Sequence, residues 1–340
     1  MGKTKVAING LGRIGRAFLK VASGANDLQI VAVNDLGEIN NLAYLLKYDS
    51  AYGRFDQKVE VKGDELIVAG QAIKVLNEKD PTRLPWGELG VEVVVESTGV
   101  FESYAAAKAH LAAGASKVVI SAPVKDEPPA GVSGATVLVG INEDRLATCQ
   151  ISSNGSCTTN AASPLMQILD EAVGIERAIL NTIHGYTASQ KLVDGPDRDW
   201  RRGRAAAANI VPSSTGAAIA VTKALPELAG KFDGLAVRVP VLAGSLVDVT
   251  FVAKRDTTVQ EINLALMKAA ASDRWQGIFA ATEEPLVSAD IVGSSFASLA
   301  QLDLTRVVDK RLVKVLAWYD NEMGYAHTLL RHVRRAGEAS

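Results

Sequence analysis

The chain has 340 residues, of which 48% are hydrophobic and 22% charged, and its formal net charge is −2. This length suits two domains or one large α/β domain, and the small net charge gives no reason to expect a nucleic acid or an anionic membrane as a partner. Two cysteines, Cys149 and Cys157, cannot build a disulfide framework, and the four histidines lie apart from them in the sequence, which indicates no metal site. We therefore expect a cytoplasmic protein from a reducing compartment.

The N-terminus and the longest apolar region argue against membrane targeting. The first apolar run is only about four residues long before glycines and arginines interrupt it, which is too short for a signal peptide. The longest apolar region, Leu235–Ala253, contains Arg238 and Asp248, and its hydrophobic residues alternate. It therefore predicts strands rather than a membrane span.

The first half of the chain alternates strand-like and helix-like segments. The pattern strand, helix, strand occurs over residues 5–10, 13–23 and 28–36, and again over 91–99, 105–115 and 117–123. The strand-like runs are almost continuous in valine and isoleucine. Such alternation predicts a parallel sheet with helices on both faces, an α/β fold of the Rossmann type.

A glycine motif lies where the first predicted strand meets the first predicted helix. Within AINGLGRIGR, Gly10, Gly12 and Gly15 have the spacing G-x-G-x-x-G. The first glycine permits a tight turn, the second lets a pyrophosphate approach the backbone, and the third lets the helix pack closely on the strand. The helix N-terminus then offers N–H groups to phosphates. The motif predicts a dinucleotide site.

Asp35 ends the second predicted strand, 20 positions beyond Gly15. A carboxylate there would bond the ribose hydroxyls of NAD and repel a 2′-phosphate, whereas the alternative is a solvated aspartate in a turn. Leu36 and Gly37 follow at positions where an NADP enzyme often has hydroxyl or basic groups. The order strand, glycine motif, helix, strand and Asp35 favours NAD as the cofactor and leaves the use of NADP open.

From about Arg177 the pattern changes. Longer strand-like runs with partial alternation cover residues 176–187, 234–241, 245–254, 298–308 and 311–320. They predict a mostly antiparallel sheet with one covered face, an α+β domain. Between them, residues 257–272 predict a helix with Val259, Ile262, Leu266 and Ala270 on one face. Residues 189–214 show no period and predict a long functional loop.

Cys157 stands in the polar stretch SSNGSCTTN, without the apolar neighbours that a buried cysteine usually has. Ala162, Leu165, Met166 and Leu169 then have the spacing of one helix face. Cys157 is therefore expected at or just before a helix N-terminus, where the dipole favours a thiolate nucleophile. A turn cysteine without a role is the alternative.

His184 is the candidate base for this thiol. It ends the apolar run AILNTI, where a lone histidine is more often structural, but an imidazole near a solitary helix-start cysteine can deprotonate the thiol and move a substrate proton. Arg202, Arg238 and the pair Thr215–Gly216 are candidate phosphate contacts. The arginines of residues 198–204 are equally consistent with a solvated or interface patch.

At these residues the sequence resembles the phosphorylating glyceraldehyde-3-phosphate dehydrogenases, the NAD-dependent glycolytic family. The resemblance runs essentially end to end, through the motifs NGLGRIGR, LLKYDSAYGRF, VVESTGVF, SCTTN, HGYTASQKLVDGP, NIVPSSTGAA and WYDNEMGY. The pair SCTTN and WYDNE, at this separation, is highly specific. It implies an NAD-binding domain over residues 1–156, joined by a C-terminal helix over 321–340, a catalytic domain over 157–320, and a homotetramer.

The resemblance also implies roles for particular residues. Cys157 would be the nucleophile and His184 the residue that raises its reactivity. The substrate phosphate or inorganic phosphate would be bound by Ser156, Thr158, Thr187, Arg202, Thr215, Gly216 and Arg238. NAD would be held by Gly10, Gly12, Arg13, Ile14, Gly15, Asp35, Lys79, Ser121 and Asn321, the last of which would bond the nicotinamide amide.

The implied reaction is the oxidation of glyceraldehyde 3-phosphate to 1,3-bisphosphoglycerate, through a thiohemiacetal and a thioester on Cys157 that inorganic phosphate attacks. Some positions depart from the family pattern. Ala161 replaces a second cysteine, Met323 a tryptophan, Lys79 an arginine, and the segment after Arg238 lacks the usual polar residues. The segment after Arg238 leaves the details of the nearby phosphate or subunit contacts open.

Two alternatives stay open at this stage. Erythrose-4-phosphate dehydrogenase has the same fold, but its relatives usually lack the threonine at Thr187 and the STG segment, both of which are present here. The other alternative is an NAD-binding interaction or RNA-binding protein that uses the arginines of residues 198–204. The net charge of −2 gives that alternative no support.

Overall fold

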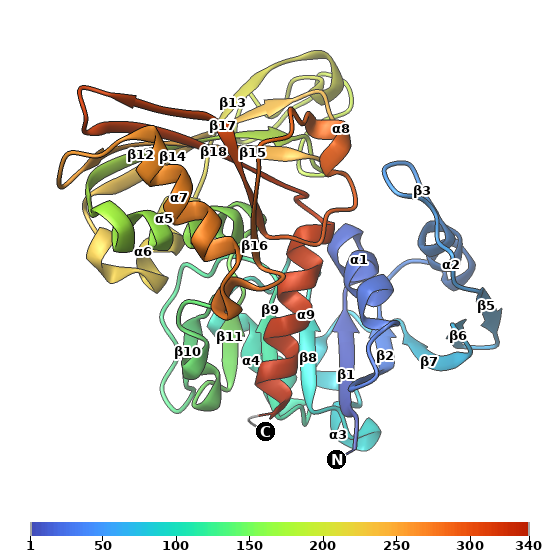
Figure 1. Ribbon diagram of the computed structural model, residues 1–340. Coiled ribbons are helices and arrows are strands. Elements are labelled where there is room, and N and C mark those ends of the chain that lie inside the picture. Colours follow the sequence, from blue (N-terminus) through green and yellow to red (C-terminus); the bar gives the residue numbers. More distant parts are fainter. Residues whose placement is uncertain (1, 339–340) are drawn as a thin grey trace. The chain divides into compact units, whose positions relative to one another are not determined.

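The computed structural model describes residues 2–338, which form two compact units. The first unit comprises the chain up to Gly155 together with the segment from Ala326 onward, and the second comprises Ser156–Tyr325. Figure 1 shows the elements of each unit in chain order.

The first unit is built on a nine-stranded sheet with the order β10-β11-β9-β8-β1-β2-β7-β6-β5. Its strands are β1 (Thr4–Asn9), β2 (Leu28–Asn34), β5 (Val59–Lys62), β6 (Glu65–Val68), β7 (Gln71–Leu76), β8 (Val93–Glu96), β9 (Lys117–Ile120), β10 (Gly134–Thr136) and β11 (Ile151–Ser153). All neighbours are parallel except β5–β6 and β6–β7. The predicted parallel sheet is confirmed, and an antiparallel edge extends it.

The helices of this unit follow the predicted alternation. They are α1 (Arg13–Ala22), α2 (Ile39–Lys47), α3 (Trp86–Leu89), α4 (Tyr104–Ala112) and most of α9 (Met323–Glu338), and β3 (Tyr48–Asp49) pairs with β4 (Gly53–Arg54). Within the unit, His332 of α9 contacts the Ser152 hydroxyl at 2.7 Å. The C-terminal helix starts at Met323 rather than at residue 321, because Asp320 accepts the N–H groups of Glu322 and Met323 before the first turn.

The second unit is built on a seven-stranded sheet with the order β13-β14-β12-β15-β18-β17-β16. Its strands are β12 (Ile175–Gly185), β13 (Val211–Ser214), β14 (Phe232–Val239), β15 (Ser245–Ala253), β16 (Phe279–Thr282), β17 (Ser298–Val308) and β18 (Leu312–Tyr319). Only β12–β14 and β16–β17 are parallel pairs. The prediction of a mostly antiparallel sheet is confirmed.

One face of this sheet is covered and the other is open. The helices are α5 (Cys157–Val173), α6 (Ala217–Ala224), α7 (Val259–Ala270) and α8 (Ser288–Ile291), and Figure 1 shows α5, α6 and α7 on the same side of the strands. Along β15, buried and partly exposed residues alternate at every position. On the open face, Ile179 and Leu312 are 63% and 44% exposed.

The prediction of a loop over residues 189–214 is wrong at its C-terminal end. Val211–Ser214 forms β13, which pairs antiparallel with β14 and buries Val211 and Ser213 while Pro212 and Ser214 stay exposed. A proline is tolerated there because β13 is an edge strand, where an N–H donor is not needed for pairing. The sequence pattern missed a four-residue strand because pairing with β14, rather than local periodicity, creates it.

Within residues 2–338, no helix has both the length and the apolar character needed to cross a bilayer. The same residues contain no group of three or more histidine, cysteine, aspartate or glutamate side chains placed to hold a metal ion.

Candidate active site

Cys157 is the first residue of α5, which confirms the predicted helix start. Ser156 caps this helix: its hydroxyl accepts the N–H of Thr159 at 3.0 Å, and the Thr159 hydroxyl accepts the Ser156 N–H at 3.2 Å. This capping box explains why the helix begins where it does. The side chain of Cys157 is partly exposed, and its Sγ lies 3.3 Å from Nε2 of His184.

His184 is held at the end of β12, where its side chain is only 3% exposed. Nδ1 lies 2.6 Å from the carbonyl oxygen of Gly185 and 2.6 Å from a guanidinium nitrogen of Arg238. When Nδ1–H donates to the carbonyl, the lone pair of Nε2 faces the thiol. The ring of Tyr319 packs edge-on against the imidazole at 5.9 Å. The imidazole therefore has fixed partners on three sides.

Burial and charge set the protonation of this pair. Burial, together with the Arg238 guanidinium, lowers the pKa of His184 to about 3. Burial raises the pKa of the Cys157 thiol, while Arg238 and the Thr158 hydroxyl and N–H act in the opposite direction. Burial thus acts against the helix N-terminus, which favours a thiolate. Both pKa shifts favour the neutral thiol and the neutral imidazole over a thiolate–imidazolium pair.

A cluster of buried hydroxyl groups lies next to the Cys157–His184 pair. The Tyr319 hydroxyl lies 2.9 Å from Oγ1 of Thr158 and 2.8 Å from Oγ1 of Thr182, and Thr182 donates to the carbonyl of Leu246. Tyr319 and Thr158 are 1% and 4% exposed. The side chain of Thr158, predicted as a phosphate contact, is therefore directed into the protein, next to the thiol.

The other predicted phosphate contacts belong to the same unit. Arg238, on β14, is partly buried beside His184, and the Arg202 Nε donates to the Ser213 hydroxyl at 2.8 Å. At the start of α6, Thr215 accepts the N–H of Ala217 at 3.2 Å, and a Cβ added at Gly216 would meet nothing within 4 Å. Open backbone at a helix start suits an anion.

Two further residues of the loop after β12 have partners of their own. Thr187 contacts the Ser189 hydroxyl at 2.9 Å, and Arg204 is paired with Asp194 at 2.8 Å. Arg202 also lies 3.8 Å from Asp199. The arginine patch of residues 198–204 is therefore partly neutralised by acidic residues of the same loop.

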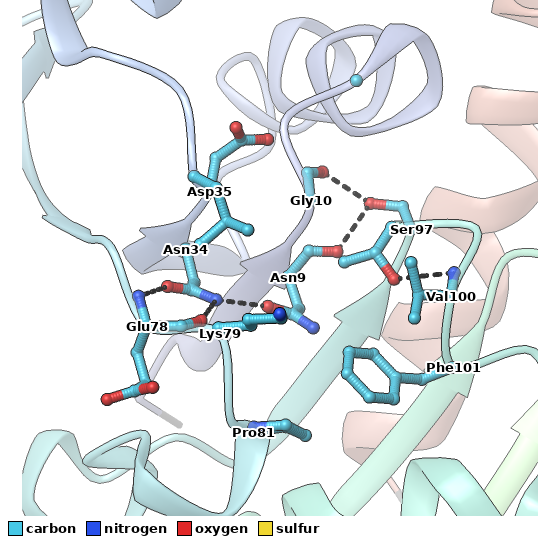
Figure 2. Close-up of a pocket in the computed structure, with 13 residues that line it drawn as sticks. Asn9, Gly10, Asn34, Asp35, Glu78, Lys79, Pro81, Ser97, Val100 and Phe101 are labelled. Carbon is cyan, nitrogen blue, oxygen red and sulfur yellow. Dashed lines mark hydrogen bonds between the residues drawn. The ribbon is translucent and has the colours of Figure 1, made fainter.

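The first unit contains a cavity of about 570 Å³ at the carboxyl ends of β1, β2 and β8 (Figure 2). Ligands of open parallel sheets bind at this edge. The lining residues are Asn9, Gly10, Gly12, Asn34, Asp35, Leu36, Glu78, Lys79, Pro81, Ser97, Thr98, Val100 and Phe101. Four of the predicted NAD contacts thus share one cavity: Gly10, Gly12, Asp35 and Lys79.

The glycines shape this cavity through close backbone approach. Gly10 has φ +95°, and a Cβ there would lie 2.7 Å from the backbone of Thr98. A Cβ at Gly15 would lie 2.0 Å from the Gly10 carbonyl oxygen. At Gly12 it would meet nothing within 4 Å, and no side chain within the described residues caps α1 there. This bare helix start fits a pyrophosphate.

Asp35 joins the glycine turn to the end of β2. One carboxylate oxygen accepts the N–H of Leu11 at 2.7 Å, and the other accepts the N–H of Gly37 at 2.8 Å. Each oxygen keeps a lone pair for a ribose hydroxyl. The cavity therefore offers the features that NAD requires: open backbone for the phosphates and a carboxylate for the ribose.

The remaining predicted cofactor residues lie outside the cavity lining. Arg13 and Ile14 form the first turn of α1, and Arg13 pairs with Asp49 at 2.7 Å. Ser121 follows β9, and Asn321 follows β18 in the second unit. In Asn321, Oδ1 accepts a hydrogen bond from Ser245 at 2.9 Å.

Sequence reasoning missed a network of polar side chains in the wall of the cavity. Asn34 donates to the side chain of Asn9, and Asn9 donates to the buried Glu96 carboxylate at 2.6 Å (Figure 2 shows the asparagine pair). Glu96 also accepts the Thr98 N–H at 2.8 Å. The available signal was a polar residue at the carboxyl end of each predicted parallel strand.

A cavity beside a G-x-G-x-x-G turn in one unit and a cysteine–histidine pair in the other are features of the nicotinamide-dependent oxidoreductases. Comparison with known families agrees: residues 4–104 match the NAD binding domain of glyceraldehyde 3-phosphate dehydrogenase, and residues 156–321 match its C-terminal domain. The chain belongs to the glyceraldehyde-3-phosphate dehydrogenase family, NAD-dependent oxidoreductases that act on an aldehyde.

Individual relatives match over nearly the whole chain. The chain is 48% identical over 328 residues to the glyceraldehyde-3-phosphate dehydrogenase of Geobacillus stearothermophilus, which covers 96% of each chain. It is 49% identical over 344 residues to that of Mycolicibacterium smegmatis, which covers 98% of this chain and 99% of the relative. It is 47% identical over 328 residues to glyceraldehyde-3-phosphate dehydrogenase 1 of Bacillus subtilis, which covers 96% of each chain.

Proposed function

We propose that the chain oxidises glyceraldehyde 3-phosphate to 1,3-bisphosphoglycerate, with Cys157 as nucleophile, His184 as base and inorganic phosphate as second substrate. The observation that carries the proposal is the 3.3 Å contact between Cys157 Sγ and His184 Nε2 at the start of α5. A nucleophile and a base within hydrogen-bond reach, with the base oriented by a third group, are the minimum for covalent catalysis. Here the third group is the Gly185 carbonyl.

The covalent steps use these two side chains. Sγ of Cys157 bonds to the aldehyde carbon while the thiol proton passes through His184 to the former carbonyl oxygen, which gives a thiohemiacetal. Bound NAD supplies the acceptor for a hydride. When the thiohemiacetal carbon loses its hydride, His184 takes the hydroxyl proton and a thioester remains on Cys157. The proton on His184 is then released to solvent, which restores the neutral imidazole.

The second half of the reaction releases the product. An oxygen of inorganic phosphate attacks the thioester carbon, the C–S bond breaks, and the leaving sulfur takes up the proton that the phosphate loses. The acyl phosphate departs and the neutral thiol is restored. Sulfur suits both halves because it is a strong nucleophile toward the aldehyde and a good leaving group from the thioester.

Anion binding near the thiol is assigned to the cationic and backbone groups of the same unit. Arg238 and Arg202 supply the charge, and the Thr215–Gly216 turn at the start of α6 supplies open backbone. Ser156, Thr158 and Thr187 complete the set implied by the family. The hydroxyls of all three already make hydrogen bonds within the protein. Each residue would therefore donate to the anion through its backbone N–H or through a hydroxyl that has turned away from its present partner.

For NAD, we assign the pyrophosphate to Gly10, Gly12 and the first turn of α1, with Arg13, Ile14 and Gly15, and the adenosine ribose to Asp35. Lys79 lies in the cavity lining, where its charge favours an anionic cofactor. Ser121 and Asn321 are proposed to contact the nicotinamide half. Asp35 favours NAD over NADP by like-charge repulsion of a 2′-phosphate.

Steady-state kinetics test the assignment. NADH formation should require both glyceraldehyde 3-phosphate and inorganic phosphate, and kcat/KM should exceed that for erythrose 4-phosphate by more than about tenfold. NADP in place of NAD should lower kcat/KM by a similar factor. Equal or better rates on erythrose 4-phosphate would contradict glyceraldehyde 3-phosphate as the substrate. Turnover that does not require phosphate would contradict an acyl phosphate as the product.

We also propose a homotetramer in the cytoplasm. The open face of the second unit's sheet exposes Ile179, Leu235 and Val308 by 50–63%, and Trp200 in the loop after β12 is 88% exposed. Large apolar side chains that stay exposed in one copy favour burial against another copy. Light scattering should give four times the chain mass, and Leu312→Glu on this face should lower it; a monomeric wild type would contradict the proposal.

A further inference from the structure

The side chain of Ser245 lies between Gly185, which follows His184, and Asn321. It is the first residue of β15 and is 1% exposed. Its hydroxyl accepts the N–H of Gly185 at 3.1 Å and donates to Oδ1 of Asn321 at 2.9 Å. The carbonyl of the same Gly185 lies 2.6 Å from Nδ1 of His184. Ser245 thus connects the end of β12, which holds the base, to Asn321.

The polarity of these bonds orients the Asn321 amide. A backbone N–H can only donate, so the Gly185 N–H occupies a lone pair of the Ser245 oxygen, and the single hydroxyl proton is left for Asn321. In the structure this proton is donated to the carbonyl oxygen of Asn321. Rotating the amide by a half-turn would place an NH₂ group against Ser245 and break this hydrogen bond. The NH₂ group of Asn321 therefore faces away from Ser245.

Close backbone packing keeps Ser245 in place. Gly244, immediately before it, has φ +86°, and a Cβ there would lie 2.1 Å from the Ser288 carbonyl oxygen. A Cβ at Gly185 would lie 2.9 Å from the carbonyl oxygen of Val241. The backbone beside both hydrogen-bond partners of the Ser245 hydroxyl thus packs closely against neighbouring segments, which limits the room in which the hydroxyl can move.

We propose that Ser245 is a positioning residue for the cofactor: it holds the Asn321 amide with its NH₂ group presented to the nicotinamide carboxamide oxygen. This inference rests on the proposed role of Asn321 in the nicotinamide contact. An amide fixed before binding loses no rotational freedom when the ring docks, and it recognises one orientation of the carboxamide. Ser245 acts through Asn321 and does not touch the reacting atoms.

A double-mutant cycle tests this relation. Ser245→Ala removes the hydroxyl and should raise the dissociation constant of NAD about tenfold, with a smaller change in kcat. Asn321→Ala should raise it by at least as much. In the double variant, the Ser245→Ala change should have no further effect, because its only route is the amide. Ser245→Thr keeps a hydroxyl and should retain most of the affinity.

The controls separate positioning from folding. Ser298 on β17 is fully buried, and its hydroxyl has no hydrogen-bond partner within residues 2–338, so Ser298→Ala should leave the NAD affinity unchanged. In each variant, the rate of Cys157 alkylation reports whether the second unit is intact. If the Ser245→Ala chain does not fold, Ser245→Thr and Asn321→Ala are compared instead. If Ser245→Thr then binds NAD as weakly as Asn321→Ala, a retained hydroxyl does not position the amide and the inference is overturned.

The outcomes distinguish the inference from the function on which it rests. An effect of Asn321→Ala without one of Ser245→Ala would overturn the positioning role and leave the proposed nicotinamide contact intact. No effect of either substitution would overturn the contact itself. Additive effects of the two would show that Ser245 acts by another route, which also overturns the inference.

Discussion

The cavity of the first unit and the thiol site of the second are built from different materials. Backbone shapes the cavity: three glycines within six residues, a bare helix start and one carboxylate that accepts two N–H groups. Side chains from distant segments build the thiol site, where Cys157, His184, Arg238 and Tyr319 come from α5, β12, β14 and β18. Each of these side chains contacts at least one of the others.

The difference predicts how each site fails. A site built from backbone needs open space beside its glycines, so one added methyl group blocks ligand binding there. A side-chain site depends on buried polar partners, so removing one group leaves another unsatisfied or changes its pKa. Substitutions of the cavity glycines should therefore leave the thiol–imidazole pair unchanged, and substitution of Cys157 should leave NAD binding unchanged. The following experiments test that separation from the largest effect to the smallest.

Cys157→Ser should lower kcat by at least about 10⁴-fold, because a hydroxyl beside an imidazole of depressed pKa is a far weaker nucleophile than a thiol. NAD binding, measured by calorimetry, should stay within about twofold, since Cys157 does not line the cavity and is not among the residues assigned to NAD. Cys149→Ala is the matched control: Cys149 is buried against Ala135, Val137 and Leu146 and should be dispensable for turnover. NADH formation that survives Cys157→Ser would contradict the mechanism.

Gly15→Ala should weaken NAD binding by about a hundredfold and lower the free energy of unfolding by a few kcal/mol, because its Cβ would lie 2.0 Å from the Gly10 carbonyl oxygen. Gly12→Ala is the matched comparison, because a Cβ there meets nothing within 4 Å. It should change stability by less than about 0.5 kcal/mol and yet weaken NAD binding, if the pyrophosphate lies against this backbone. Equal stability losses in both variants would contradict the packing argument.

Arg238→Leu should raise the pKa of His184 from about 3 toward its ordinary value, because the guanidinium is the second cause of the depression after burial. It should also raise the pKa of Cys157 further, since the same charge acts to lower it. Alkylation of the thiol at neutral pH should slow about tenfold for each unit of pKa. Arg204→Leu, in which an exposed arginine paired with Asp194 is lost, should leave the alkylation rate as in the wild type.

The stability of the chain should decline as the pH falls from 6.5 toward 3, because His184 and His332 both have pKa values lowered from 6.5 to about 3 by burial. In that window the unfolded chain binds protons that the folded chain excludes, so each group contributes a slope of up to about 1.4 kcal/mol per pH unit. Urea unfolding at several pH values measures it.

His332→Gln tests the contribution of the first unit to this pH dependence of stability. The variant loses the contact with Ser152 and should be less stable at pH 7, but its stability should depend less steeply on pH below 6.5. A slope identical to that of the wild type would contradict the assignment of His332 to this window.

Local pattern was enough to predict much of the fold. Near-continuous valine runs predicted the parallel sheet, and alternation predicted β15 and its neighbours, because periodicity records which face is buried. The strand β13 was missed because it exists through pairing with β14. The hydroxyl of Ser245 and the cluster around Tyr319 were missed for a related reason: their partners lie 60 or more positions away along the chain.

The sequence by itself determined the turn, the helix starts and the candidate chemistry, because the G-x-G-x-x-G spacing and the polar stretch that precedes the α5 helix face act through neighbouring residues. The tertiary structure alone decided the protonation and orientation of the site. Burial lowers the pKa of His184 and raises that of Cys157, and Ser245 donates a hydrogen bond to Asn321. Desolvation and long-range hydrogen bonds arise only when distant segments pack together, so local pattern cannot contain them.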